Sequence, residues 1–415
     1  MKLLMLCNNA PGAVRSKLSG KEQSAVNWVD HVLSGLRQRG LTIRILFRGT
    51  GSEGVLDEKC SFASFGEELP YIYRPELEER FREELRSFRP DVIHSWGVEY
   101  DHALAMVNAA EKEELLDHMV ASIQGLCGFI AEHYADGVPE KAVNHSTFRD
   151  LIRKDNILQQ QEKFRLRGKL EQQAVEKLRH VIGRTTWDHE RVKEWNPKVN
   201  YHFCNETLRH PFYDDLWSYE KCRAHSVFAS SCSYPVKGFH YLLKAMAIVR
   251  KAYPDAAITV TGRSYLGGGI KEKLRRGGYE AYLAKLTKKH HLENAVRFLG
   301  DLSAQDMKQA FLDANVFVLP STIENSPNSL GEAMLLGVPS VAADVGGVRD
   351  LMQDGTEGRI YEAGQVEALA EHICDLFAME ELAGQLGQNA RVHARNTHDP
   401  EANLEALLEI YQKLM

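Results

Sequence analysis

Glu324 and Glu332 lie close to a predicted strand-to-helix junction in the second half of the chain. The run VFVLP, 316–320, is typical of a buried parallel strand, and Pro327 is well placed to begin a helix. The first turn of a helix presents unpaired backbone N–H groups, which favour a phosphate. Glu324 in the loop can accept from sugar hydroxyls, and Glu332 on the helix can accept from a ribose diol. The pattern predicts a nucleotide-sugar site, although Glu332 on spacing alone could instead serve the helix dipole.

The elements that position these residues alternate along the chain. In the first half, predicted strands separated mostly by helical stretches cover 3–7, 42–47, 91–96, 119–124, 180–184 and 200–204. In the second half they cover 226–231, 257–262, 296–300, 316–320 and 340–344. Such alternation is typical of parallel sheets covered by helices on both faces. We therefore predict an α/β protein with two Rossmann-like, doubly wound parallel-sheet domains facing a cleft.

The alternation is interrupted near 205–225, where aromatic residues, Pro211 and charges cluster. We place an N-terminal acceptor-binding domain at 1–205 and a C-terminal nucleotide-sugar-binding domain at 206–397. A last helix, 398–415, has a helical apolar stripe.

In a doubly wound sheet, ligands bind outside the carboxyl ends of the strands. In the second domain the residues at these ends are Lys237 with Gly238, Gly262 with Arg263, Gly300 with Asp301, the Glu324 loop, and Gly346 with Gly347. Glycines allow close backbone approach, and Lys237 and Arg263 supply positive charge for a pyrophosphate. Taken alone, each of these glycines is better explained as the end of a strand, and Lys237 as a surface lysine. The five strand ends together favour a ligand-binding site.

Composition limits the class of protein. The 415 residues are 44% hydrophobic, enough for two cores, and the net charge of -6 gives no reason to expect nucleic-acid binding. Seven cysteines form no CxxC pair and cannot all pair with one another, which indicates a reducing, cytoplasmic compartment. The opening MKLLMLC is too short for a signal sequence or a membrane span and is better interpreted as a strand.

The pattern Glu-x7-Glu followed by Ala-Met-x-x-Gly-x-Pro resembles the signature of family-four retaining glycosyltransferases of the GT-B fold, the glycosyl transferases group 1. The likeness covers most of 225–365 and extends more loosely through the first half. It implies transfer of a sugar, with retention, from a nucleotide diphosphate sugar, UDP favoured, to a glycan, lipid-linked or small-molecule acceptor. It implies polysaccharide or glycoconjugate biosynthesis, and a last helix that crosses back to the N-terminal domain. No cofactor or metal is expected, because these loops lack a DxD-type carboxylate cluster.

The resemblance also implies roles for individual residues. Lys237 and backbone amides at the helix start stabilise the pyrophosphate, Glu324 orients the sugar and Glu332 fixes the ribose. The full donor set is Gly20, Lys237, Gly238, Arg263, Glu324, Asn325, Asn328, Ser329, Leu330 and Glu332. The chain departs from the family at Cys232, where members usually carry an arginine. Arg263 is our candidate for the missing cation, and Arg184 a weaker one.

Signals in the N-terminal domain are weaker. Gly20 stands where the family has a glycine-rich loop, and His94 matches a histidine that we assign to catalysis, with packing beneath the loop as the alternative. On the acceptor or reacting-sugar side we place Gln124, His133 and Arg184. Gln124 replaces a histidine near the reacting sugar, and an amide cannot act as a general base near neutral pH.

Other interpretations stay open. Lys163, Arg165, Arg167 and Lys169 lie on a predicted helix within 157–179, so weak peripheral membrane contact at the inner face of the membrane is a minority hypothesis beside an ordinary solvated helix face. A nucleotide-sugar epimerase of the same fold would need no acceptor. A non-catalytic nucleotide-sugar-binding relative is compatible with Cys232 and Gln124. A nicotinamide dehydrogenase is poorly supported, because no GxGxxG links a strand to a helix.

Overall fold

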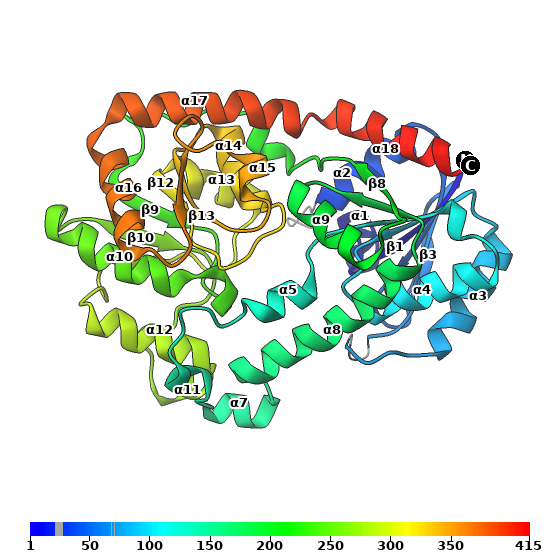
Figure 1. The fold of residues 1–415 in the computed structure, drawn as a ribbon, viewed down its shortest axis with the longest axis horizontal. Helices are drawn as coiled ribbons and strands as arrows, with labels where there is room; N and C mark the ends of the chain where they lie inside the picture. The colour runs from blue at the N-terminus through cyan, green and yellow to red at the C-terminus, as the bar shows by residue number, and fades with distance from the viewer. Residues whose placement is uncertain (21–27, 68, 70) are drawn as a thin grey trace. The chain divides into compact units, whose positions relative to one another are not determined.

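A computed structural model describes residues 1–20, 28–67, 69 and 71–415. The chain divides into two compact units (Figure 1). Unit 1 comprises Met1–Phe129, Phe164–Arg209 and Thr397–Met415, and unit 2 comprises Ile130–Lys163 and His210–Asn396.

Unit 1 is built on one sheet whose described strands have the order β3-β4-β2-β1-β5-β6-β7-β8. Neighbouring strands are parallel except β3 and β4, which form an antiparallel pair. The strands are β1 Lys2–Cys7, β2 Thr42–Phe47, β3 Glu53–Asp57, β4 Cys60–Ser64, β5 Val92–Trp96, β6 Met119–Ser122, β7 His180–Gly183 and β8 Asn200–Phe203. The β3–β4 pair was not predicted from the sequence.

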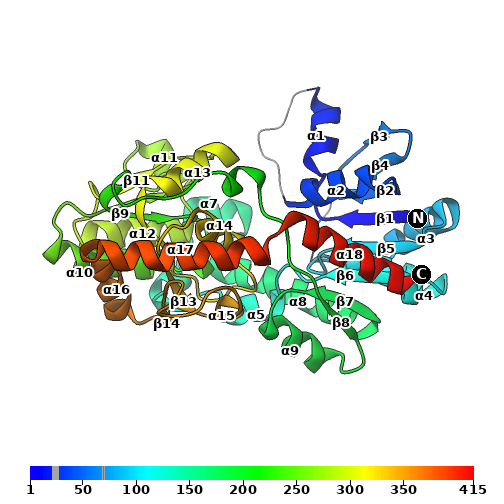
Figure 2. The same cartoon turned by 90° about the horizontal axis from the view of Figure 1, so that it is seen from above.

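Helices cover both faces of this sheet, as the alternating sequence predicted. They are α1 Gly12–Ser19, α2 Trp28–Gln38, α3 Glu76–Phe88, α4 Asp101–Lys112, α9 Thr186–Trp195 and α18 Pro400–Leu414, with α5 Cys127–Glu132 and α8 Ile157–Lys177 passing from one unit to the other. One apolar cluster packs α3, α4 and α8 against one face. A second packs α2 and α18 against the other, where Leu407 and Tyr411 of α18 are buried (Figure 2). The last helix therefore contributes core to the N-terminal sheet.

Unit 2 contains a fully parallel sheet with the strand order β11-β10-β9-β12-β13-β14 in its described part. Its strands are β9 Arg223–Ala229, β10 Ala257–Val260, β11 Val296–Phe298, β12 Ala314–Leu319, β13 Ser340–Asp344 and β14 Arg359–Glu362. In sequence order this is 3-2-1-4-5-6, the order of dinucleotide-binding sheets, in which the connection reverses between the first and fourth strands. The switch point of unit 2 therefore lies at the carboxyl ends of β9 and β12.

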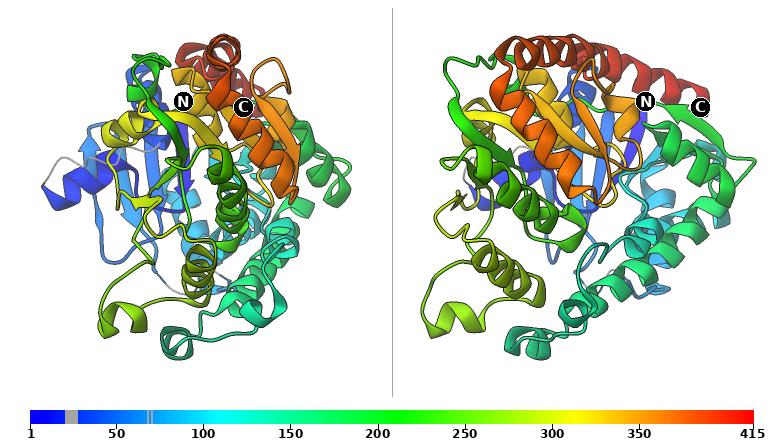
Figure 3. Two further views of the ribbon diagram at one scale, coloured as in Figure 1. Left: turned by 90° about the vertical axis from the view of Figure 1, so that its left-hand side faces the viewer. Right: turned by 60° about the vertical axis from the view of Figure 1, so that its left-hand side comes forward.

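The helices of unit 2 are α6 Glu140–Val143, α7 Phe148–Arg153, α10 Phe239–Ala252, α11 Ile270–Leu274, α12 Gly278–Lys289, α13 Ala304–Leu312, α14 Asn328–Leu336, α15 Val348–Leu351, α16 Val366–Ala378 and α17 Glu380–Thr397. Figure 3 shows α10, in green, beside α16, in orange, and the two helices are in contact. None of the described helices of the chain is both long and apolar enough to span a membrane.

The segment Ile130–Lys163 differs from the sequence-based domain boundary, because it packs with unit 2 although it lies within 1–205. The backbone oxygen of Asp136 lies 3.0 Å from Nε2 of His240. Thr147 Oγ1 donates to the Arg276 backbone oxygen at 2.7 Å. Contacts distant in sequence, rather than the local pattern, decide where this segment belongs.

Unit 1 also buries an acidic side chain, Glu171 of α8. The backbone amides of Cys127 and Gly128 face it, but in the described part of the chain its carboxylate oxygens have no hydrogen bond of ordinary geometry. Burial raises the pKa of Glu171 well above the usual range, and the nearby Glu99 carboxylate raises it further. The folded protein therefore keeps a proton that the unfolded chain releases, so this group lowers stability as the pH rises above about 4.5.

We expect Glu171→Gln to unfold at a higher temperature than the wild-type protein near about pH 8, because glutamine fills the same space without charge. The gain should shrink towards about pH 4, where the wild-type carboxyl is also protonated. Thermal unfolding across this pH range measures the gain in melting temperature. The control is Glu176→Gln, at an exposed position of the same helix. A Glu171→Gln protein less stable than wild type at every pH contradicts the interpretation.

Candidate functional site

The switch point of unit 2 brings Lys237 and Glu324 together, 87 positions apart in sequence. Lys237 ends a short 3-10 helix after β9, and Glu324 lies in the loop between β12 and α14. Lys237 Nζ donates to Glu324 Oε1 at 2.6 Å, and Ser321 Oγ donates to the same oxygen at 2.7 Å. The Glu324 side chain is 12% exposed and that of Lys237 37% exposed, so the lysine stays accessible to a ligand.

Two glycines set the backbone around this pair. Gly238 has φ of 64°, and a Cβ there would lie 1.7 Å from the Pro320 carbonyl oxygen. Gly346 has φ of 52°, and a Cβ there would lie 1.8 Å from the Glu324 carbonyl oxygen. Only glycine permits both this conformation and this approach. The loop 320–324 is therefore held between the ends of two other strands.

The amino end of α14 lies directly after this loop. Pro327 precedes its first residues, Asn328 and Ser329, with no side-chain cap and no acidic residue in the first turn. The helix therefore leaves its positive end without a carboxylate of its own, which suits an anion. Glu332 is the fifth helical residue and almost fully buried, beyond the first turn where a carboxylate serves the dipole best. Asn325 and Leu330 are also buried.

The position of the missing arginine is occupied by a buried thiol. Burial raises the pKa of Cys232 to about 12, with a further contribution from Glu280, so the thiol is neutral and supplies no cation. Arg263 Nη2 lies 3.0 Å from Glu280 Oε1. A carboxylate near Cys232 thus holds the guanidinium that we expected to replace the arginine. A phosphate would have to compete with Glu280 for it.

His133 lies in unit 2, whereas the sequence placed it in the N-terminal domain. Its backbone oxygen accepts from Thr322 Oγ1 at 2.8 Å, and its Nδ1 lies 2.8 Å from Asp136 Oδ2. The residue therefore touches the Glu324 loop through its backbone and leaves its ring half exposed.

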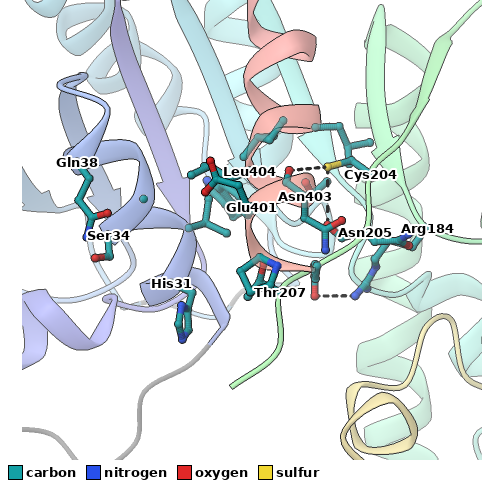
Figure 4. Close-up of a pocket in the computed structure, with 18 of the residues that line it drawn as sticks. His31, Ser34, Gln38, Arg184, Cys204, Asn205, Thr207, Glu401, Asn403 and Leu404 are labelled. Atoms are coloured by element: carbon teal, nitrogen blue, oxygen red, sulfur yellow. Dashed lines mark hydrogen bonds and ion pairs between the residues drawn. The ribbon is translucent and has the colours of Figure 1, made fainter. Parts of the chain in front are cut away.

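A pocket of about 280 Å³ with both polar and apolar lining residues lies within unit 1 (Figure 4). Figure 4 shows its walls on α2, on α18 and along the chain that follows β8. Its polar lining includes His31, Ser34, Gln38, Ser122, Arg184, Asn205, Glu206, Thr207, Glu401 and Asn403. These amides, hydroxyls and charged groups are suited to hydrogen bonding a hydroxyl-rich molecule.

Glu206 joins two residues that the sequence placed on the acceptor side. Arg184 Nη1 donates to Glu206 Oε2 at 2.6 Å, and Gln124 Nε2 donates to Glu206 Oε1 at 2.8 Å. Glu206 was not predicted, although it follows a predicted strand, 200–204, at the end where the strand-end rule applies. Its carboxylate holds both side chains, of which Arg184 lines the pocket.

The environment of His94 argues against the catalytic role expected for it. Its ring is fully buried, with Nδ1 2.7 Å from the Tyr411 hydroxyl and Nε2 2.8 Å from Ser122 Oγ. Burial lowers the pKa of His94 to about 3, so the ring is neutral near pH 7. The sequence analysis gave packing beneath the loop as the alternative; the ring is packed, but between Tyr411 of α18 and Ser122 of β6.

Gly20 ends α1 with φ of 66°, and the residues that follow it, 21–27, lie outside the described part. The expected contact of this loop with a ligand stays a prediction. Within the described ranges, no group of three or more His, Cys, Asp or Glu side chains is placed to hold a metal ion.

Comparisons with known proteins agree with this geometry. Residues 227–393 match the family of glycosyl transferases group 1. D-inositol 3-phosphate glycosyltransferase of Corynebacterium urealyticum is 27% identical over 179 residues, 43% of this chain and 41% of the relative. The chain thus spans about two fifths of that relative's length in the match.

Two solved structures resemble the whole chain. Sucrose-phosphate synthase of Thermosynechococcus elongatus has a TM-score of 0.71 at 17% identity, covering 100% of this chain and 99% of that one. HepE of Anabaena in complex with UDP-glucose has a TM-score of 0.67 at 17% identity, covering 99% of each chain. The chain has the GT-B fold, as the sequence predicted. The match to the glycosyl transferases group 1 lies within unit 2 of this fold.

We expect Gly238→Ala to destabilise unit 2, because alanine must adopt a positive φ and its Cβ would collide with the Pro320 carbonyl. A non-glycine residue in this conformation costs on the order of 1–3 kcal/mol before any clash. Thermal unfolding measures the loss. Gly384→Ala in α17 is the control, because among the described residues no atom beyond its chain neighbours and the backbone of its own helix lies within 4 Å of the added Cβ. Equal stability of the two variants would contradict the tight approach.

Proposed function

We propose that this protein is a retaining, metal-independent glycosyltransferase that moves a hexosyl group from a nucleotide diphosphate sugar to a glycan, lipid-linked or small-molecule acceptor. The observation that carries the proposal is the Lys237–Glu324 pair at the switch point of unit 2, shortly before the amino end of α14, whose first turn contains no acidic residue. The group 1 match over this unit supports a sugar-transfer chemistry. The likeness to HepE bound to UDP-glucose favours UDP as the donor nucleotide.

In the proposed reaction, an acceptor hydroxyl oxygen bonds to the anomeric carbon on the face from which the diphosphate leaves. The bond from that carbon to the phosphate oxygen breaks, and the hydroxyl proton passes to the departing phosphate. Negative charge grows on the diphosphate, so its stabilisation is the main task of the protein. Lys237 and the backbone amides of Asn328 and Ser329 would supply it.

The positions of Glu324, Glu332 and Arg263 suggest the remaining contacts with the donor. Glu324 would orient the transferred sugar by accepting from its hydroxyls, and the buried Glu332 would accept from the ribose. Arg263 would supply a second cation if the phosphate replaces Glu280 as the partner of its guanidinium.

The acceptor would be held in unit 1. Arg184 lines the pocket of unit 1 and would offer donors there, while Gln124 shares the Glu206 carboxylate with it. We further propose a role in polysaccharide or glycoconjugate biosynthesis, at a cytoplasmic location.

A panel of UDP, GDP, ADP and their common sugar conjugates, without added metal, tests the donor site. We expect one nucleotide to raise the melting temperature selectively, because a ligand that binds only the folded state stabilises it in proportion to occupancy. Lys237→Ala should abolish the shift, and Lys251→Ala on α10, away from the strand ends, should keep it. If no nucleotide binds at about millimolar concentration, the catalytic proposal fails and the protein is better described as a scaffold.

Glu324→Gln separates orientation of the sugar from nucleotide binding. We expect transfer to fall on the order of 100-fold, because a misplaced sugar loses alignment with the acceptor, while nucleotide affinity changes little. Lys237→Ala should weaken both quantities, and the surface change Glu367→Gln on α16 should alter neither. Rates come from a transfer assay and affinities from calorimetry. Equal loss of nucleotide affinity in the Glu324 and Lys237 variants would count against these separate roles.

A further inference from the structure

Two short helices of unit 2 turn apolar side chains towards solvent. On α7, Phe148, Leu151 and Ile152 are 58%, 68% and 66% exposed at the i, i+3 and i+4 positions of one stripe. On α11, Ile270 and Leu274 are 79% and 47% exposed, four positions apart. A helix of a globular protein normally turns such a stripe into the core. We call these five residues the α7–α11 face.

The start of α7 is bonded to the residues just beyond α11, which places the two helices in one region of unit 2. Thr147, which caps α7, donates through Oγ1 to the backbone oxygen of Arg276, just beyond α11, at 2.7 Å. The buried Asp150 carboxylate faces Gly278, where an added Cβ would lie 3.2 Å from Oδ2. Apolar side chains that are exposed together in one region of a surface mark an interaction site.

Positive charge surrounds this face. The helices and the residues just after them carry exposed cations at Arg153, Lys154, Lys271, Lys273 and Arg275. Glu272 is the exposed acid of the same two segments, since Asp150 is buried. The surface therefore combines apolar side chains with an excess of positive charge.

A basic pocket of about 580 Å³ adjoins the α7–α11 face. Its lining includes Lys141, Lys244, Lys285 and Lys289 together with His145 and Tyr282, and it contains no acidic residue of the described part of the chain. His145 lies two positions before Thr147, and Gly278 both lines the pocket and faces Asp150. Burial and the charge of Lys289 lower the pKa of Lys244, as expected where like charges gather without a counter-ion. We call this the lysine pocket.

We propose that the α7–α11 face binds the surface of an anionic phospholipid bilayer, with a lipid phosphate in the lysine pocket. Apolar side chains enter the boundary between headgroups and acyl chains, while lysine and arginine remain at the level of the phosphates. A protein partner fits less well, because lysine is depleted in the cores of protein interfaces. The inference does not depend on which nucleotide the donor site takes.

This surface differs from the helix within 157–179 for which the sequence suggested weak membrane contact. Two of the basic residues of α8 have partners within the protein: Lys163 Nζ lies 2.8 Å from Asp155 Oδ1, and Arg167 Nε donates to the Glu99 backbone oxygen at 2.9 Å. Arg165 and Lys169 are exposed, so membrane contact through α8 stays a prediction. The Arg167 guanidinium also lies 4.3 Å from the centroid of the Tyr100 ring. The combination of exposed apolar stripe and positive charge lies on α7 and α11.

Cosedimentation of the full chain with vesicles tests the proposal. We expect binding to vesicles of phosphatidylcholine with about one third phosphatidylglycerol, little binding to phosphatidylcholine alone, and release by salt. The triple variant Leu151→Ser, Ile152→Ser, Ile270→Ser tests the face, and Lys244→Glu with Lys289→Glu tests the pocket. Each should lower the bound-to-free ratio at least about tenfold.

The control variant is Leu216→Ser with Val392→Ser, which removes two comparably exposed apolar residues elsewhere on unit 2 and should bind as wild type. Unchanged melting temperatures, and an unchanged response to nucleotide, separate a failure of this proposal from a failure of the donor site. Absence of wild-type binding to anionic vesicles overturns the proposal. So does equal binding by all variants, or a dimer that the triple variant dissociates without any lipid binding.

Discussion

The donor site of unit 2 depends on the close approach of backbone to backbone around the loop 320–324. Gly238 and Gly346 come from the ends of different strands, and each lies where a side chain would collide with a carbonyl oxygen of this loop. The backbone N–H of Thr322 adds a hydrogen bond to the Val236 oxygen at 2.9 Å. These contacts fix the three strand ends relative to one another. Lys237 therefore loses little backbone conformational entropy when it contacts Glu324.

The Lys237–Glu324 pair explains how a site built for an anion stays stable without one. The carboxylate forms an ion pair with the lysine, and α14 begins a few residues after Glu324 with no acidic residue in its first turn. A diphosphate bound there would replace the Glu324 carboxylate as the ion-pair partner of Lys237. Glu324 Oε1 could then accept a hydrogen bond from a sugar hydroxyl. In this arrangement donor binding itself would prepare the carboxylate that orients the sugar.

The parallel strands and the Lys237–Glu324 pair could be predicted because buried parallel strands are continuous apolar runs and ligands gather at their carboxyl ends. The strands β3, β4 and β14 were not predicted. EGVLD and RIYE are short and half polar, and CSFAS is short and consists mostly of small residues. A histidine at a strand end has the same sequence signal whether it faces a ligand or, like His94, the Tyr411 hydroxyl. Apolar spacing in α7 predicts a core-facing stripe, and only the folded chain shows it exposed.

The placement of Ile130–Lys163 connects the two features of unit 2 that we assign to ligands. The segment meets the Glu324 loop at His133, whose backbone oxygen accepts from Thr322, and meets α10 at Asp136 through His240. Further along it forms α7 and, through Thr147, is joined to the residues that follow α11. These contacts hold it to unit 2 at separate points. Burial of the α7–α11 face in a bilayer would therefore orient unit 2 as one body, and with it the strand ends that carry Lys237, relative to lipid-linked molecules in that bilayer.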